Sequence, residues 1–247
     1  MTKETSEHSA HPGESVGHAE LVDAKRNIGR RPPEAMVRAA LARAGVLAVR
    51  IIGPPGSGKT ELIEATLKRL PGPRRVAVIV VDPASVREAN RLHNLCGYVA
   101  HLDSAVPAPA AIWRIISQLR LEDFDFILIE GCGGMAPLKD IGQDATAAVL
   151  AVSGGDDKAL EYHALLESAS VILLSKIDVR QLVKFDEQVF RKDVNTIAPE
   201  AQIIELSAVT GSGMFRWSEW LDKARTAKKC RDDPADPNQS SPNTYFG

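Results

Sequence analysis

The chain has 247 residues, with 30 Lys and Arg against 32 Asp and Glu, so its formal net charge is −2 at pH 7. A nearly neutral chain has no bulk electrostatic attraction to nucleic acid or to an anionic membrane, and we expect neither as a partner. Hydrophobic residues make up 44% of the sequence and charged residues 25%, a globular composition that excludes intrinsic disorder for the body of the chain.

Apolar runs and cysteine usage indicate the compartment. The longest apolar runs stop far short of the roughly 20 residues needed to cross a bilayer, and the polar N-terminus has no apolar signal region. The three cysteines, Cys96, Cys132 and Cys230, are odd in number and in no CxxC spacing, so they form no disulfide framework. We therefore expect a soluble cytoplasmic protein.

Polar segments without hydrophobic periodicity flank the body of the chain. Residues 1–31 and residues 228–247, the latter rich in Pro, Asn and Ser, bury too little apolar surface to offset the entropy lost on ordering. Three irregularly spaced histidines in the first segment lack the density of a metal-binding tract. We therefore predict disordered tails at 1–31 and 228–247 around one folded domain, 32–227.

Within the domain, short β-branched runs alternate with helical patterns. Strands are predicted at Val46–Ile52, Val76–Val81, Phe126–Glu130, Ala147–Val152, Val171–Ser175 and Gln202–Leu206. Helices are predicted at Pro33–Ala44, Lys59–Arg69, Ser85–Leu95, Ala108–Leu119, Lys158–Glu167, Gln181–Ile197 and Gly213–Ala227. The strands are nearly continuous in apolar residues, which is typical of strands buried on both faces. The pattern predicts an α/β fold: a doubly wound, mainly parallel sheet with helices on both faces.

A glycine-rich segment follows the first predicted strand. Gly53–Thr60 reads GPPGSGKT and matches GxxxxGK[ST] between a strand and a helix. Gly53, Gly56, Ser57 and Gly58 belong to a loop whose N–H groups converge on phosphates. Lys59 is expected to reach the terminal phosphates, and the Thr60 hydroxyl to ligate Mg²⁺. The segment therefore predicts a P-loop, with Glu61 next to it as a further nucleotide-binding candidate.

Carboxylates end two further strands of the predicted sheet. Asp82 follows Val76–Val81, where it can ligate the Mg²⁺ of the P-loop and position the attacking water; capping the next helix is its alternative role. Glu130 closes another strand and opens a glycine-rich loop, which can contact a γ-phosphate or form only a tight turn. We take Lys59, Asp82 and Glu130 as the catalytic candidates.

Two loops at strand ends predict the base that is recognised. Ser175-Lys176-Ile177-Asp178 is close to the N-K-x-D with which GTPases recognise guanine: Asp178 can accept from the N1–H and N2 amino groups while the Lys176 stem packs on the ring. Adenine lacks this donor pair. Ser207 and Ala208 stand where GTPases place a backbone N–H against O6. The Ser175 side chain is shorter than the usual Asn, which predicts fewer loop-bracing hydrogen bonds.

Together these residues resemble HypB, the hydrogenase nickel-incorporation GTPase family, and more distantly the urease counterpart UreG. The resemblance covers about Pro33 to Leu221 and rests on Gly53–Thr60, Asp82-Pro83-Ala84-Ser85, Arg87–Arg91, His101-Leu102-Asp103, Gly155-Asp156-Asp157-Lys158, Ser175–Asp178 and Ser207–Gly211. It implies a P-loop GTPase domain, slow hydrolysis of GTP with Mg²⁺, and a homodimer when GTP is bound. It also implies that Lys158 contacts nucleotide across the dimer; its alternative role is a first-turn helix lysine.

The chain departs from the family at the metal ligands. HypB proteins hold the transferred metal with a Cys-His pair and with a Cys before a Pro, where this chain has Ala100-His101 and Ala136-Pro137. Thiolates give such a site its affinity for Ni²⁺ or Zn²⁺. Displaced ligands could come from Cys96 and Cys132 beside His101; the alternative is that Cys96 is a core residue.

The resemblance implies a metallochaperone-type switch that inserts a metal, most simply nickel, into a client metalloenzyme such as NiFe hydrogenase, with a client or metallochaperone as partner. One alternative is a GTP-binding assembly scaffold that carries no metal itself. Another is a P-loop small-molecule kinase, which would require an arginine-rich lid that the sequence does not show.

Overall fold

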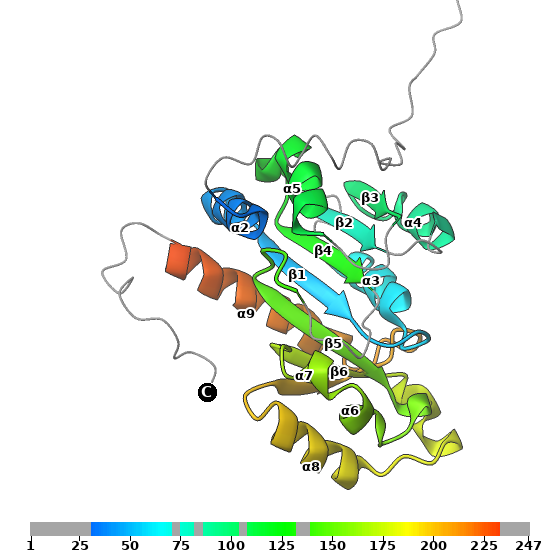
Figure 1. Ribbon diagram of the computed structural model, residues 1–247. Coiled ribbons are helices and arrows are strands. Elements are labelled where there is room, and N and C mark those ends of the chain that lie inside the picture. The colour runs from blue at the N-terminus through cyan, green and yellow to red at the C-terminus, as the bar shows by residue number, and fades with distance from the viewer. Residues whose placement is uncertain (1–30, 71–74, 82–85, 104–107, 132–138, 233–247) are drawn as a thin grey trace, which may run out of the picture.

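A computed structural model of the chain describes residues 31–70, 75–81, 86–103, 108–131 and 139–232 (Figure 1). Within these residues seven strands form one sheet, and all neighbouring strands are parallel. In spatial order the strands are β3 (Tyr98–Leu102), β2 (Val76–Val81), β4 (Phe126–Gly131), β1 (Leu47–Ile52), β5 (Ala145–Ala151), β6 (Val171–Ser175) and β7 (Gln202–Glu205).

Helices connect the strands and cover both faces of the sheet (Figure 1). The α-helices are α2 (Pro33–Ala44), α3 (Lys59–Leu67), α4 (Val86–Leu92), α5 (Pro109–Gln118), α6 (Lys158–Glu161), α7 (His163–Leu166), α8 (Glu187–Ile197) and α9 (Met214–Asp232). The 3₁₀ helices are η2 (Leu121–Asp123), η3 (Val152–Gly154) and η4 (Ile177–Leu182).

The core confirms the doubly wound prediction. Successive side chains of β1 point to opposite faces, so Val49 and Ile51 pack under α3, α4 and α9. Ala48 packs with α2 and α5, and Ile52 with α6, α7 and α8. Every residue of β1, β2 and β4 is buried, which explains why these segments read as continuous apolar runs rather than as alternating ones.

One strand was missed. Tyr98–Leu102 pairs with β2 and forms the edge of the sheet. Only Val99 and Leu102 of its five residues are buried, so the segment lacks the continuous apolar run by which the other strands were predicted. An edge strand has one neighbour, and here it also carries His101.

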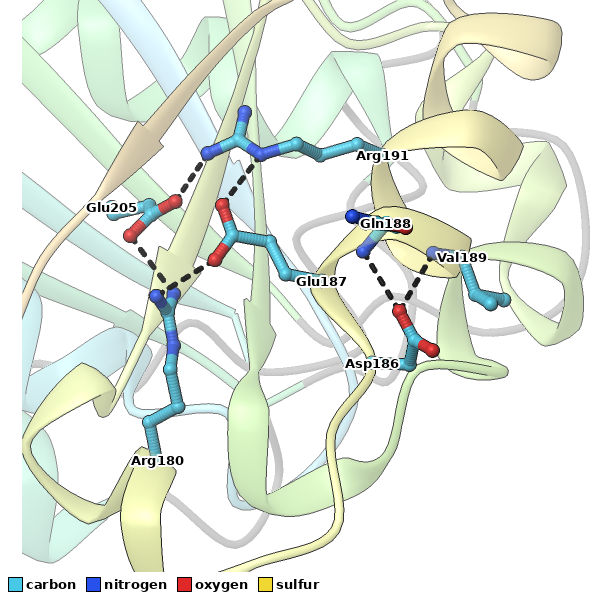
Figure 2. Close-up of polar contacts among 7 residues, drawn as sticks. All are labelled: Arg180, Asp186, Glu187, Gln188, Val189, Arg191 and Glu205. Atoms are coloured by element: carbon cyan, nitrogen blue, oxygen red, sulfur yellow. Dashed lines mark hydrogen bonds and ion pairs between the residues drawn. The ribbon is translucent and has the colours of Figure 1, made fainter.

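Two predicted helices have different boundaries in the structure. Lys158–Glu167 is divided into the short helices α6 and α7. Gln181–Ile197 begins as the end of η4, and α8 starts only at Glu187, because Asp186 caps it by accepting from the Gln188 and Val189 N–H groups at 2.9 and 3.1 Å (Figure 2). Such a cap contributes about 1 kcal/mol.

The last helix is longer than predicted. It continues through Asp232, although residues 228–232 were assigned to a disordered tail. The Lys228 side chain is 2% exposed and its Nζ lies 2.5 Å from Oδ1 of Asp144, which is 4% exposed. Asp144 also accepts from the Ala48 N–H at 2.8 Å. The tail boundary at 228 is therefore wrong. Nothing in the sequence indicated it, because a lysine in a polar segment looks the same whether it is exposed or paired with a buried carboxylate.

Some sequence predictions fall where the structure is not described. Asp82 and Cys132 lie outside the described residues, as do 1–30 and 233–247 of the predicted tails. No helix among the described residues is long and apolar enough to span a bilayer.

Candidate functional site

The P-loop follows β1 and leads into α3, as its sequence predicts. A Cβ at Gly53 would lie 2.2 Å from the Val149 carbonyl oxygen, so only glycine allows this close approach to β5. Gly56 and Gly58 have φ of 75° and 90°, which favours glycine, and Gly58 directly precedes the first turn of α3. The N-terminal end of α3 therefore points its unpaired N–H groups at the loop, an arrangement that favours phosphate.

Two side chains of the first turn of α3 are buried in this loop. Lys59, 8% exposed, donates from Nζ to the carbonyl oxygens of Gly53 and Pro54 at 3.0 and 3.1 Å. The Thr60 hydroxyl donates to Oε1 of Glu130 at 2.6 Å. Because β4 lies beside β1 in the sheet, its carboxyl end brings the Glu130 carboxylate to Thr60. The hydroxyl and carboxylate oxygens form a hard donor set, which suits Mg²⁺.

The segment after β6 is fastened to the P-loop by two side chains. Ser175, 3% exposed, donates from its hydroxyl to the Ser57 carbonyl at 2.6 Å and lies 3.2 Å from the Leu150 carbonyl. Lys176 donates from Nζ to the Gly56 carbonyl at 2.6 Å. The loop bracing for which an Asn was expected thus comes from Ser175, a role that the sequence analysis missed.

The backbone at Lys176 is in the left-handed region. Its φ of 59° makes it the only non-glycine residue with positive φ among the described residues. This conformation costs about 1 kcal/mol or more and persists where the surrounding contacts hold it. Here it turns the chain from β6 into η4, while the lysine stem lies across the P-loop and Asp178 remains exposed on η4.

The Ser207–Ala208 segment lies beside this turn. Leu206 donates from its N–H to the Leu174 carbonyl at 2.9 Å and accepts from the Ile177 N–H at 3.4 Å. Ser207 is fully buried, and its hydroxyl accepts from the Thr210 N–H at 3.1 Å. The structure therefore places the P-loop, the Lys176–Asp178 turn and the Ser207 loop at the carboxyl ends of β1, β6 and β7, on one edge of the parallel sheet, where ligands bind in open α/β sheets.

The P-loop helix is also joined to α9. The indole Nε1 of Trp217 donates to the Thr66 hydroxyl at 2.9 Å, and that hydroxyl donates to the Leu62 carbonyl at 2.6 Å. Trp217 is fully buried and stacks on Trp220 with ring centroids 5.3 Å apart. This contact joins α9 to the P-loop helix, and nothing in the sequence predicted it.

Two nucleotide-binding candidates lie apart from these contacts. Lys158 begins α6 and is paired with Glu161 of the same helix, whose hydrogen bond raises the pKa of Lys158. Glu61 is an exposed residue of the first turn of α3.

Of the three transition-metal candidates, the structure describes His101 and Cys96. That residue is 5% exposed, and its thiol donates to the carbonyls of Leu92 and Tyr98, both at 3.4 Å. Burial raises its pKa to about 11, so it carries no thiolate at neutral pH. His101 lies on edge strand β3. No group of three His, Cys, Asp or Glu that could hold a metal is found in the part of the chain that the structure describes. Cys96 is therefore a core residue, the alternative that the sequence left open.

Comparison with known proteins agrees with this geometry. The family model for the CobW/HypB/UreG nucleotide-binding domain matches residues 47–205. The hydrogenase maturation factor HypB of Escherichia coli is 34% identical over 200 residues, covering 77% of this chain and 67% of that protein. HypB of Archaeoglobus fulgidus superposes with a TM-score of 0.70 at 26% identity, over 83% of this chain and 99% of that one.

A third relative agrees in fold. HypB of Helicobacter pylori, solved in complex with nickel, has a TM-score of 0.73 at 23% identity and covers 80% of this chain and 95% of that one. The matched region runs from the first strand, through the P-loop and the Lys-x-Asp turn, to the last strand of the sheet. The chain is a member of the CobW/HypB/UreG family of P-loop nucleotide-binding proteins.

Proposed function

We propose that the chain is a cytoplasmic GTP-hydrolysing switch that assists insertion of a metal, most simply nickel, into a metalloenzyme such as NiFe hydrogenase. The observation that carries the proposal is the pair of hydrogen bonds from Ser175 and Lys176 to the P-loop backbone. These bonds hold the segment that would recognise the base against the loop that would bind the phosphates, so the two form one site. The name of the Escherichia coli relative and the nickel bound to the Helicobacter pylori protein support the choice of client and cargo.

The phosphates would be bound by the backbone of Gly53–Thr60 and by Lys59, which exchanges its carbonyl partners for phosphate oxygens. Thr60 and Asp82 would hold Mg²⁺, with Glu130 in contact with Thr60. When bound, the ion would neutralise charge on the β- and γ-phosphates. Asp82 and Glu130 are the candidates for orienting the attacking water.

Guanine would be recognised by the exposed carboxylate of Asp178, which accepts from N1–H and the N2 amino group. The Lys176 stem would pack on the ring, and a backbone N–H of Ser207–Ala208 would donate to O6. With ATP the carboxylate would face no donor pair, so its charge-assisted hydrogen bonds to the base would be lost, at a cost of about 1.5–3 kcal/mol. This predicts a preference for GTP over ATP of roughly tenfold or more.

The switch would act through a homodimer that forms when GTP is bound and separates after hydrolysis, with Lys158 contacting the nucleotide of the other subunit. To do so Lys158 must exchange its bond to Glu161 for one to phosphate. A ligand shifts the equilibrium between monomer and dimer only if it binds one of them more tightly than the other. GTP must therefore bind the dimer more tightly than the monomer, and GDP must lack this preference.

One observation favours a second candidate function. Because the Cys96 thiol is buried and protonated, it offers no soft ligand to a transferred metal. A GTP-dependent assembly scaffold, whose metal is carried by a partner metallochaperone, would need no such ligand in this chain. Nickel titration of the purified protein separates the two: a metallochaperone switch should bind Ni²⁺ with an affinity that differs between its GTP-bound and GDP-bound forms, whereas a scaffold that carries no metal should bind it in neither.

The decisive experiment measures binding of GTP, GDP and ATP by calorimetry, phosphate release, and mass by light scattering on the purified full chain. Lys59→Ala should abolish nucleotide binding, whereas Lys68→Ala, an exposed lysine at the other end of α3, should leave it unchanged. Preference for GTP, slow hydrolysis and GTP-dependent dimers are expected. Preference for ATP, or transfer of phosphate to a small molecule by a monomer, would contradict the proposal.

A further inference from the structure

Four charged side chains form a closed ring next to the two loops that would recognise the base, which carry Asp178 and Ser207. Cations and carboxylates alternate around the ring (Figure 2). The guanidinium of Arg180 donates to Glu187 Oε2 at 3.0 Å and to Glu205 Oε2 at 2.8 Å. Arg191 donates to Glu187 Oε1 at 2.7 Å and also to Glu205 Oε1. Each group thus binds two of opposite charge, and the ring is neutral overall.

The ring members stand close to the base-reading groups in sequence. Arg180 lies two residues after Asp178 on η4, and Glu205 lies two residues before Ser207 at the end of β7. The bond between Arg180 and Glu205 therefore joins the two loops that would contact adjacent groups on one edge of guanine, N1–H and N2 by Asp178 and O6 by the Ser207 loop. The backbone bond between these loops, from the Ile177 N–H to the Leu206 carbonyl, is long at 3.4 Å. The Leu206 N–H also donates to the Leu174 carbonyl at 2.9 Å where the two strands end, and the side-chain bond at 2.8 Å adds a short link beyond that strand pairing.

The surroundings of the ring limit its freedom. The Arg180 and Glu205 side chains are 29% and 23% exposed, so solvent screens their bond less than it screens a surface pair. The Arg180 guanidinium lies 5.9 Å from the centre of the Phe185 ring, which in turn packs on fully buried Phe190. The Arg191 guanidinium lowers the pKa of Glu187, which stays ionised at neutral pH. The two terminal nitrogens of Arg180 are both used in the ring, whereas its buried Nε has no hydrogen-bond partner. Linked charged hydrogen bonds hold their parts more firmly than isolated pairs do.

We propose that Arg180 and Glu205 are positioning residues for base selectivity, which hold the Asp178 turn at the distance from the Ser207 loop that guanine requires. The inference rests on the proposed function, since it assumes that Asp178 recognises guanine. Neither residue contacts the nucleotide: Arg180 acts through Asp178, and Glu205 acts through the loop that follows it.

Inosine triphosphate distinguishes positioning from general stability. It carries the same phosphates as GTP and the same O6 and N1–H, but lacks the N2 amino group that Asp178 would accept from. The ratio of GTP to inosine triphosphate affinity therefore measures how well Asp178 is placed. Changes at the P-loop or in overall stability lower both affinities together and leave the ratio unchanged.

The test compares Arg180→Gln, Glu205→Gln and their double variant with wild type, in the full chain with Mg²⁺. Each single variant should lower the ratio about fivefold, the expected effect of weakening one charged hydrogen bond, while changing the affinity for inosine triphosphate by less than about twofold. Because both substitutions break the same link, the double variant should lower the ratio no further than either one. Arg191→Gln is the matched control: it also breaks two ring bonds but leaves the link between the loops, so its ratio should equal that of wild type.

The outcomes separate this inference from the proposed function. If wild type prefers GTP and Arg180→Gln keeps the wild-type ratio, the ring is only structural and the inference is overturned, while the guanine assignment stands. If wild type does not distinguish GTP from inosine triphosphate or ATP, the guanine assignment fails and the inference fails with it. Should Arg180→Gln not fold, Arg180→Lys gives the same readout, with an intermediate fall in the ratio expected because an ammonium replaces a two-armed donor.

Discussion

Replacing Lys228 by Met removes the charge from a buried ion pair at the amino ends of β1 and β5. The side chains of Lys228 and Asp144 are 2% and 4% exposed, so Asp144 would remain buried with only the Ala48 N–H as a close donor. Breaking a buried pair in this way costs about 3–5 kcal/mol. Arg231 lies 3.6 Å from Asp144 and is 65% exposed, so it compensates in part, and we expect a loss of about 3 kcal/mol.

The loss is measured by urea unfolding without nucleotide, because a bound ligand would add its own stabilisation. Fluorescence is a suitable signal since Trp217 and Trp220 are buried on α9. With a slope of about 2 kcal/mol per M, the midpoint should fall by about 1.5 M. Lys223→Met on the same helix is the control: its side chain is 73% exposed and pairs with Glu219 at the surface, so its effect should stay below about 0.5 kcal/mol.

Truncation after Ala227 tests whether the last turn of α9, which includes Lys228, contributes to stability. A disordered tail could be removed without effect, whereas loss of the last turn of α9 should destabilise the chain at least as much as Lys228→Met does. If both variants unfold within about 1 kcal/mol of wild type, the burial of Lys228 contributes little and the reasoning is refuted.

Three further predictions concern single side chains. Ser175→Ala should weaken GTP binding about fivefold by calorimetry, since it removes one buried neutral hydrogen bond to the P-loop; unchanged affinity would contradict the bracing role. In a titration with iodoacetamide at pH 8 followed by mass spectrometry, exposed Cys230 should react while Cys96 does not, because its pKa is raised to about 11 by burial; rapid labelling of Cys96 would disprove its burial. The hydrogen bond from Arg75 lowers the pKa of Asp125 below its ordinary 3.8, so this carboxylate stabilises the fold above about pH 4 and loses that contribution as the pH falls through the lower folded value. Unfolding free energy should therefore depend less on pH below about 4 in Asp125→Asn, and an unchanged dependence would argue against the pairing.

The nucleotide site could be predicted from sequence because its parts are local. Gly53–Thr60 carries its whole signal in eight consecutive residues, and the backbone conformation of a glycine loop between a strand and a helix follows from those residues. Ser175–Asp178 is local in the same way. Their common location also followed, since loops after parallel strands meet at one edge of the sheet.

Elements whose identity depends on neighbours could not be predicted in this way. Strand β3 is defined by its pairing with β2 rather than by a continuous apolar run. The start of α8 depends on Asp186, one of many aspartates able to cap. Cys96 could be a ligand or a core residue until its burial and its two carbonyl partners were known.

The sequence alone determined that this chain is an α/β P-loop protein with a Lys-x-Asp turn after a strand of the sheet, because periodicity and contiguous motifs are properties of short segments. Only the tertiary structure decided which distant side chains meet. Ser175 reaches Ser57 across 118 positions, and Lys228 reaches Asp144 across 84. Such pairs leave no pattern in a single sequence, since a serine or a lysine looks the same whether its partner is water or a buried group, and the free energy of the contact exists only once the sheet has brought the two together.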